Sequence, residues 1–233
     1  MKRIIAFITV FTILATNLPS YAQDSSSIVP AVLKRLSLSY DLNTLYPKDL
    51  DNVYFNGGAV GYNMDFRISE SKPLYIGTGL DLHMVTRSKT YYQDEQYNLV
   101  NIKQRTTFIN MNVPVDISLR IPLYHNLTFT PFAGLNFRIQ LYGHNRNRIQ
   151  AGADSSQLEG ILDRMELGPA DGNLFSEKDY GDAHLNRFQM GWHAGIRLQY
   201  RHISLQASYG SDFVKLHRNL GSSNLIISVG YTL

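Results

Sequence analysis

Histidine and carboxylate side chains are the groups of this chain with the chemistry to bind a metal or transfer a proton. The sequence has seven histidines and no cysteine, which excludes disulfides and thiolate metal sites. No two histidines stand in an HExxH motif or another close pair, so we predict neither a metal nor a cofactor. For His83 and His193, polar contacts with Asp81 or Asp116 are favoured over metal binding.

Other reactive side chains gather in one long polar segment, residues 143–186. It contains His144, Asp154, Ser155, Asp179 and His184. A serine hydrolase needs these residue types, but no GxSxG or comparable motif arranges them, and polar residues gather in loops by default. We therefore predict no catalytic residues, and a lipid-modifying enzyme is the less favoured alternative.

Basic residues at the start of the same segment suit a different chemistry. His144, Arg146 and Arg148 follow one another at every second position. Cationic side chains form charge-assisted hydrogen bonds with phosphates. The three are therefore candidate contacts for lipopolysaccharide, with ordinary surface charge as the alternative interpretation.

The middle of the segment predicts a short helix. Within residues 155–167, Leu158, Ile161, Leu162 and Met165 recur at helical spacing. Ser155 or Ser156 would cap the helix. Two interpretations stay open: a helix that docks a protein partner, or a helix that lids the molecule.

The elements that must position these groups alternate between apolar and polar residues. This period of two indicates strands, and it recurs in eight segments: 36–42, 60–68, 74–84, 109–119, 129–141, 188–200, 205–209 and 225–233. Most reach the roughly 9–11 residues that a tilted strand needs to cross a bilayer. Strands of soluble proteins average only about 5–6 residues, so strand length favours a membrane barrel.

The connections between these segments alternate in length. Residues 70–73, 122–126 and 201–202 are short, whereas 44–53, 88–103, 143–186 and 211–223 are longer. Outer-membrane barrels have this order, with short periplasmic turns and long extracellular loops. An even number of strands then places both termini in the periplasm.

The two faces of the predicted strands differ in composition. The apolar face carries almost no charge, so we expect it to lie in lipid. The polar face carries small residues, including eight glycines, and a set of ionisable residues that we expect to form a network in the lumen: Asp65, Arg67, Asp81, His83, Asp116, Arg120, Arg138, His193 and Arg197. An eight-stranded barrel has an interior filled by its own side chains, so we predict no open solute pore.

The first residues form a predicted signal peptide. Lys2 and Arg3 precede an apolar stretch at residues 4–15, and Ser20 and Ala22 suit cleavage after Ala22. Residues 23–32 then form a periplasmic segment, and 33–233 the barrel. Without Lys2 and Arg3 the chain has 20 basic and 19 acidic residues, so its charge does not favour nucleic-acid binding.

Three segments carry a resemblance to a known family. Residues 112–120 (NVPVDISLR), 132–135 (FAGL) and the hairpin 188–209 are similar to strands of the small outer-membrane β-barrel family of Bacteroidetes, which includes PorT-like proteins. The resemblance implies an outer-membrane location in a didermal bacterium. It also implies an alternative function, as a component of a secretion or gliding apparatus.

The sequence thus predicts an all-β, eight-stranded antiparallel up-and-down transmembrane β-barrel with a porin-like fold. We expect a structural or interaction role through the extracellular loops. The expected partners are outer-membrane lipid and lipopolysaccharide, and a protein that binds loop 143–186.

Overall fold

The computed structural model describes residues 30–48, 51–69, 72–95, 98–124, 126–151, 157–165, 167–217 and 220–233. The predicted signal peptide, 1–22, lies outside this range, as does most of the predicted periplasmic segment, 23–32. Ser155 and Asp154 also lie outside it.

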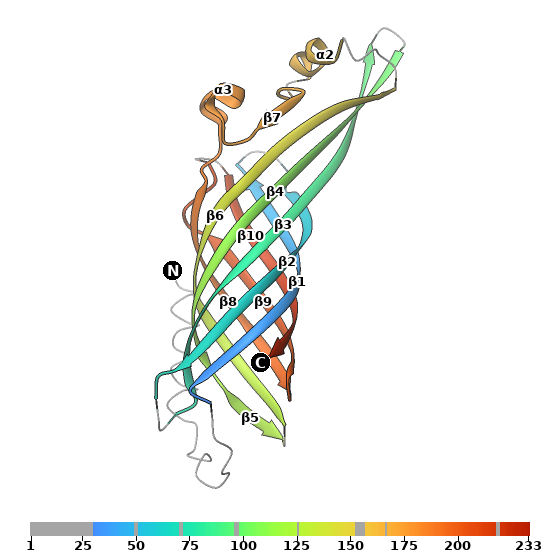
Figure 1. The fold of residues 1–233 in the computed structure, drawn as a ribbon. Coiled ribbons are helices and arrows are strands. Elements are labelled where there is room, and N and C mark those ends of the chain that lie inside the picture. The colour runs from blue at the N-terminus through green and yellow to red at the C-terminus, as the bar shows by residue number, and fades with distance from the viewer. Residues whose placement is uncertain are drawn as a thin grey trace.

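Eight long antiparallel strands form a closed ring in the described part of the chain (Figure 1). They are β1 (Val32–Pro47), β2 (Val53–Arg67), β3 (Leu74–Glu95), β4 (Asn98–Leu119), β6 (Leu127–Ala151), β8 (Phe188–Tyr200), β9 (Ile203–Asp212) and β10 (Leu220–Thr232). β1 pairs with both β2 and β10, and β4 pairs with β6, which closes the ring. The predicted eight-stranded up-and-down barrel is therefore confirmed.

The period of two separates the inner from the outer surface. On β1, Leu36, Leu38 and Tyr40 are exposed, and Leu38 keeps 66% of its surface accessible. The alternate residues Arg35 and Asp41 are buried, Asp41 to 2%. An apolar outer face with a polar interior is the arrangement of a barrel that lies in lipid.

One end of the barrel has short connections. Tyr200 pairs with Ile203, so Arg201 and His202 alone join β8 to β9. Arg201 adopts a positive φ of 53°, as a two-residue hairpin turn requires. The predicted turn 122–126 is partly strand, because β5 (Ile121–Tyr124) pairs with the start of β6. The C-terminus lies at this short-turn end (Figure 1).

At the other end the prediction of long loops was partly wrong. Residues 88–103, predicted as a loop, belong mostly to β3 and β4, which pair as far as Glu95 and Asn98. β6 likewise runs to Ala151, well into the predicted loop 143–186. β3, β4 and β6 therefore project beyond the ring as a three-stranded extension (Figure 1). In this extension the outer face of each strand carries mainly polar residues, so the alternation that marks the lipid-facing strands disappears from the sequence.

Short elements follow β6: α2 (Leu158–Arg164), β7 (Asp171–Asn173), α3 (Glu177–Tyr180) and the 3-10 turn η3 (Gly181–Ala183). β7 adds to the edge of β6. The predicted helix within 155–167 is thus present, although its N-cap residue is Gln157, with no side-chain cap hydrogen bond. Among the described residues, no helix is long and apolar enough to span a membrane.

Candidate functional site

A three-residue ion cluster lies in the lumen toward the short-turn end of the barrel. Arg35 of β1 and Arg197 of β8 both bind the same carboxylate oxygen of Asp65 on β2, at 3.3 Å and 2.9 Å. All three side chains are buried. Because one carboxylate neutralises only one of the two guanidinium groups, the cluster keeps a net charge of +1. It ties together strands on opposite sides of the ring.

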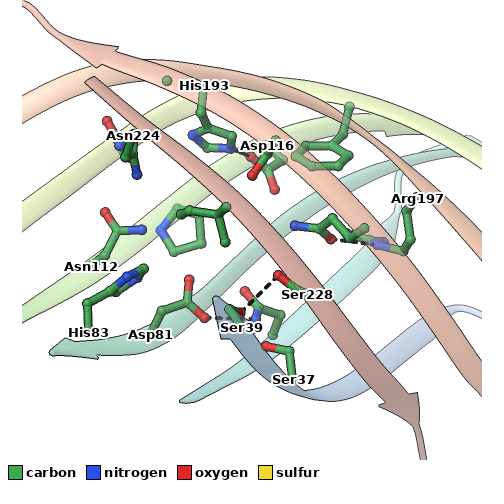
Figure 2. Close-up of a pocket in the computed structure, with 18 of the residues that line it drawn as sticks. Ser37, Ser39, Asp81, His83, Asn112, Asp116, His193, Arg197, Asn224 and Ser228 are labelled. Atoms are coloured by element: carbon green, nitrogen blue, oxygen red, sulfur yellow. Dashed lines mark hydrogen bonds and ion pairs between the residues drawn. The ribbon is translucent and has the colours of Figure 1, made fainter. Parts of the chain in front are cut away.

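Two histidine–aspartate pairs lie in the same space. His83 Nδ1 lies 2.8 Å from Asp41 Oδ2, and His193 Nε2 contacts Asp116 Oδ1. Figure 2 shows His83 and His193 projecting into one pocket from different strands. Of the two carboxylates expected to contact these histidines, Asp116 contacts His193, whereas Asp81 accepts a hydrogen bond from Asn63 at 3.0 Å. No group of three or more His, Asp or Glu suited to a metal occurs among the described residues.

Arg138 belongs to a third cluster, nearer the long-strand end. It pairs with Asp212 at 3.1 Å, and Asp212 also accepts hydrogen bonds from Gln189 and Ser222. The two remaining predicted lumen residues sit near the short-turn end: Arg67 donates to the carbonyl oxygen of Ser69, and Arg120 directly follows Leu119, the last residue of β4. The predicted lumen residues thus fall into several separate clusters along the barrel.

The space left between these side chains is small. The main cavity in the lumen has a volume of about 60 Å³ and is lined largely by polar groups from strands around the ring (Figure 2). Such a volume holds a few water molecules. Water there would satisfy buried atoms on its lining that lack a protein partner, such as Asn112 Oδ1 and His83 Nε2.

An apolar cluster closes the lumen at the long-strand end. It consists of Leu45, Phe55, Val85, Phe108 and Leu216, and we call it the plug. Phe108 packs edge-on against Phe55, with ring centroids 5.4 Å apart, and against Phe175, 6.4 Å away. Phe175 precedes α3, so the segment after β6 contributes to this closure. The plug is therefore a small hydrophobic core at the long-strand end of a lumen that is otherwise polar.

The helix α2 does not lid the mouth. Its buried residues Ile161 and Leu162 pack against Val100 and Ile102 of β4. The opposite side of α2, including Glu159 and Asp163, is exposed. Because the strand extension already covers the apolar side of the helix, that side is not free to dock a partner.

The predicted rim residues have separate surroundings. His144 Nε2 contacts Asp171 of β7, and Arg146 donates to the same carboxylate at 3.1 Å. His184 Nδ1 lies 2.8 Å from the carbonyl oxygen of Gly181, and Asp179 accepts from the backbone of Asn173. Within the described ranges, no serine hydroxyl is hydrogen-bonded to His144 or His184.

The pKa of Asp171 is set by these neighbours. Desolvation by the surrounding protein raises its pKa, but the hydrogen bond from Arg146 and the nearby His144 outweigh it. The net result is a pKa below the ordinary value of the carboxyl group. Asp171 therefore stays ionised and holds β7 against the edge of β6.

Sequence reasoning missed three lumen residues that complete the clusters: Arg35, Asp41 and Asp212. Asp41 stands on the polar face of a predicted strand, so the alternation could have identified it. Arg35 continues that alternation one step before the predicted strand. Asp212 was assigned to a loop, and its inward position became apparent only from the structure.

None of the curated proteins matches the chain. Similar solved structures include Ail of Yersinia pestis in complex with a heparin analogue, with 10% identity, 88% of this chain and 100% of the other covered, and a TM-score of 0.47. Neisserial surface protein A has 10% identity, covers 88% and 98%, and has a TM-score of 0.39. OprG of Pseudomonas aeruginosa has 7% identity, covers 87% and 96%, and has a TM-score of 0.34. These similarities are too low to bear on function.

The polar lumen, the apolar outer band and the closed ring agree with the match to one family model. That model, the outer membrane protein beta-barrel domain, matches residues 33–211. The chain therefore belongs to the outer membrane protein beta-barrel domain family and is a protein of the outer membrane.

Proposed function

We propose that this protein is a closed barrel that acts as an interaction protein through the strands that project from it. In this proposal the short turns and both termini lie in the periplasm, and the extension of β3, β4 and β6 lies outside the cell. The observation that carries the proposal is the combination of a plugged lumen with a long extension of paired strands. A plug opposes solute passage, whereas an extension of paired strands presents a surface to a partner.

The partners follow from what this surface carries. Arg146 and Arg148 lie on the exposed side of the extension, which supports contact with lipopolysaccharide of the surrounding leaflet. The segment 143–186 offers a protein partner the polar side of α2 and the exposed part of α3. His144 contributes less than expected to lipid contact, because Asp171 engages it.

A flux experiment separates the interaction protein from a channel. The purified barrel is reconstituted in liposomes, and sugar uptake is measured by swelling. We expect no uptake above that of empty liposomes, since the plug fills the mouth. Porin-like uptake would refute the closed barrel.

A complementation experiment tests the extension itself. Residues 90–103 are replaced by Asn-Gly, so that a two-residue turn joins Lys89 to Gln104, which pair in the register of β3 and β4. The shortened barrel should reach the outer membrane and stay resistant to SDS at room temperature. It should nevertheless fail to restore the wild-type phenotype to a strain that lacks the gene. Full restoration by the shortened barrel would exclude the extension as the working part.

A lipid-modifying enzyme is the second candidate, and the contact between His144 and Asp171 favours it. A histidine held by a carboxylate near the membrane surface is a common arrangement for a general base. The test is mass spectrometry of lipid A from cells with the wild-type protein or His144→Ala. A mass change that requires His144 supports the enzyme, and identical spectra from the deletion strain and wild type oppose it.

The role in a secretion or gliding apparatus rests on the sequence resemblance and stays a prediction, as does the assignment to Bacteroidetes. A component of such an apparatus should co-purify with periplasmic or outer-membrane proteins in mild detergent. Isolation as a lone barrel under these conditions would count against it.

A further inference from the structure

The outer face of the extension changes chemistry in successive rows of paired residues. Met84, Ile109 and Tyr142 form the last apolar row across β3, β4 and β6. The next outward row contains Thr86, Thr107 and His144. The boundary between lipid and headgroups therefore lies close to these two rows.

Four cations occupy the two rows beyond. Arg105 of β4 faces Arg146 of β6, and Lys103 faces Arg148. All four are exposed on the outer side of the sheet. Like charges directly opposite each other on neighbouring strands are destabilising, so this arrangement is costly unless an anion lies between them.

Among the described residues, one carboxylate lies beside these four cations. Asp171 pairs with Arg146. Within the described ranges, no salt bridge joins Lys103, Arg105 or Arg148 to a carboxylate. The five charged groups together carry a net charge of +3. The extension thus keeps a concentrated positive charge on one face.

A groove runs between these side chains. It has a volume of about 430 Å³ and is lined by Thr86, Ser88, Lys103, Arg105, Arg146 and Arg148. This size is within the roughly 300–1,000 Å³ of small-molecule sites. Lysine and arginine offer only hydrogen-bond donors, and the Ser88 hydroxyl can add a donor beside them, whereas the Thr86 hydroxyl already donates to the carbonyl oxygen of Thr106. The complementary ligand is an anion rich in acceptor oxygens, such as a phosphorylated saccharide.

The height of the groove fits the headgroup layer. Arg105 lies four residues along β4 from Ile109, and Lys103 six. At about 3.4 Å per residue and a tilt of about 45°, the two cations stand roughly 10 and 14 Å above the last apolar row. A bilayer headgroup region begins directly above the hydrocarbon, so the phosphates of a large glycolipid headgroup are within reach.

We propose that this groove binds the phosphate groups of an outer-leaflet glycolipid headgroup. The inference rests on the proposed function, which places the extension outside the cell. It adds Lys103 and Arg105 to the lipopolysaccharide contacts expected from the sequence, and it leaves out His144. A lipid is favoured over a soluble saccharide because the groove lies on the outer face of the sheet, directly beyond the lipid-facing rows.

The same hairpin offers a matched control. Arg87 and Lys89 of β3 alternate with the outward residues Thr86 and Ser88, and Lys89 lies over Tyr91 at 4.7 Å. The outer variant is Lys103→Gln with Arg105→Gln, and the control is Arg87→Gln with Lys89→Gln. Both variants remove two positive charges from one hairpin, on opposite faces of the sheet.

Binding is measured with the full barrel in nanodiscs by native mass spectrometry. The probes are phosphorylated lipid A, enzymatically dephosphorylated lipid A and a soluble phosphorylated disaccharide. We expect wild type to prefer phosphorylated over dephosphorylated lipid A by at least tenfold, since charge-assisted contacts dominate. The outer variant should lose at least tenfold in affinity for phosphorylated lipid A, and the control should retain wild-type affinity.

Three outcomes would overturn the proposal: wild-type affinity in the outer variant, an equal loss in the control, or no preference for phosphate. Tighter binding of the soluble disaccharide would overturn the choice of a lipid. None of these results touches the complementation experiment with residues 90–103 replaced, so the failure of this site is distinguishable from the failure of the interaction function.

Discussion

Replacing Asp65 by asparagine should strongly destabilise the barrel. The Asp65 carboxylate lies 3.3 Å from Arg35 and 2.9 Å from Arg197, and all three groups are buried. Asp65→Asn raises the net charge of the cluster from +1 to +2 and leaves two buried guanidinium groups without a carboxylate. Breaking a buried ion pair by removing one partner costs about 3–5 kcal/mol, and we expect a loss of this size in the free energy of unfolding.

Arg35→Met is the matched control. It leaves Asp65 paired with Arg197, so the cluster becomes neutral, and the methionine fills part of the arginine volume. Replacing a buried charge that has no full partner by an apolar group is commonly neutral or stabilising. We therefore expect Arg35→Met to lie within about 1 kcal/mol of wild type, or above it.

The assay is urea unfolding in detergent micelles, followed by fluorescence. The chain has a single tryptophan, Trp192 of β8, whose indole packs edge-on against Tyr209 at 6.0 Å. Its emission therefore reports the pairing of β8 with β9. A loss below about 1 kcal/mol in Asp65→Asn, or equal losses in both variants, would refute the assignment of Asp65 as the charge that holds the cluster.

Three further outcomes follow from single contacts. Gly134→Ala should lower the free energy of unfolding by about 1–3 kcal/mol or prevent folding, because its Cβ would stand 2.0 Å from the carbonyl oxygen of Val115. Gly221→Ala is the control, because open space surrounds that position. In the same urea assay it should stay within about 0.5 kcal/mol of wild type. Phe108→Ala should cost about 3–5 kcal/mol and raise ion conductance in planar bilayers, and unchanged stability would exclude a plug. The lowered pKa of Asp171 means that its contact stabilises β7 above the ordinary carboxyl pKa of 3.8 and is lost as pH falls through the lowered value. Hydrogen exchange of β7 should therefore be insensitive to this group from roughly pH 5 to 8, whereas Asp171→Asn should speed it across that range.

The barrel was predictable because lipid imposes a simple rule. Where one face of a strand meets hydrocarbon and the other meets a packed lumen, apolar and polar residues must alternate. β1 shows this from Leu36 to Leu42. The same rule placed Asp65, Asp116 and Arg197 on the inner face. It did not reveal which of them pair, because pairing depends on the register between strands that are far apart in sequence.

The extension was harder to predict because apolar and polar residues no longer alternate in strands that lie beyond the lipid. In residues 88–103 no face of the strands lies against hydrocarbon along its whole length. Polar residues therefore occur on both faces. Val100 and Ile102 are buried against α2, which lies more than 50 residues further along the chain. A strand whose apolar partner is a distant helix carries no local pattern strong enough to identify it.

A change of phase in β3 marks the edge of the membrane. Up to Met84 the outward residues are apolar and the inward ones, such as His83, are polar. Val85 is buried in the plug, and Thr86 faces outward, so the apolar side switches from outside to inside within two residues. Phe108 and Thr107 repeat the switch on β4, at the paired positions.

The apolar side changes from the outer to the inner face because the strands pass from lipid into water. Below the switch, lipid covers the outer face, and the barrel must satisfy its polar groups inside. Above it, water covers the outer face, and an ordered extension needs an apolar core of its own, as any water-soluble sheet does. The plug and the α2 contact supply that core. The same strands, β3, β4 and β6, thus form part of a membrane barrel and, beyond it, a small sheet exposed to water. A sequence search for adjacent apolar residues such as Met84 and Val85, which break the alternation, would locate the junction between them.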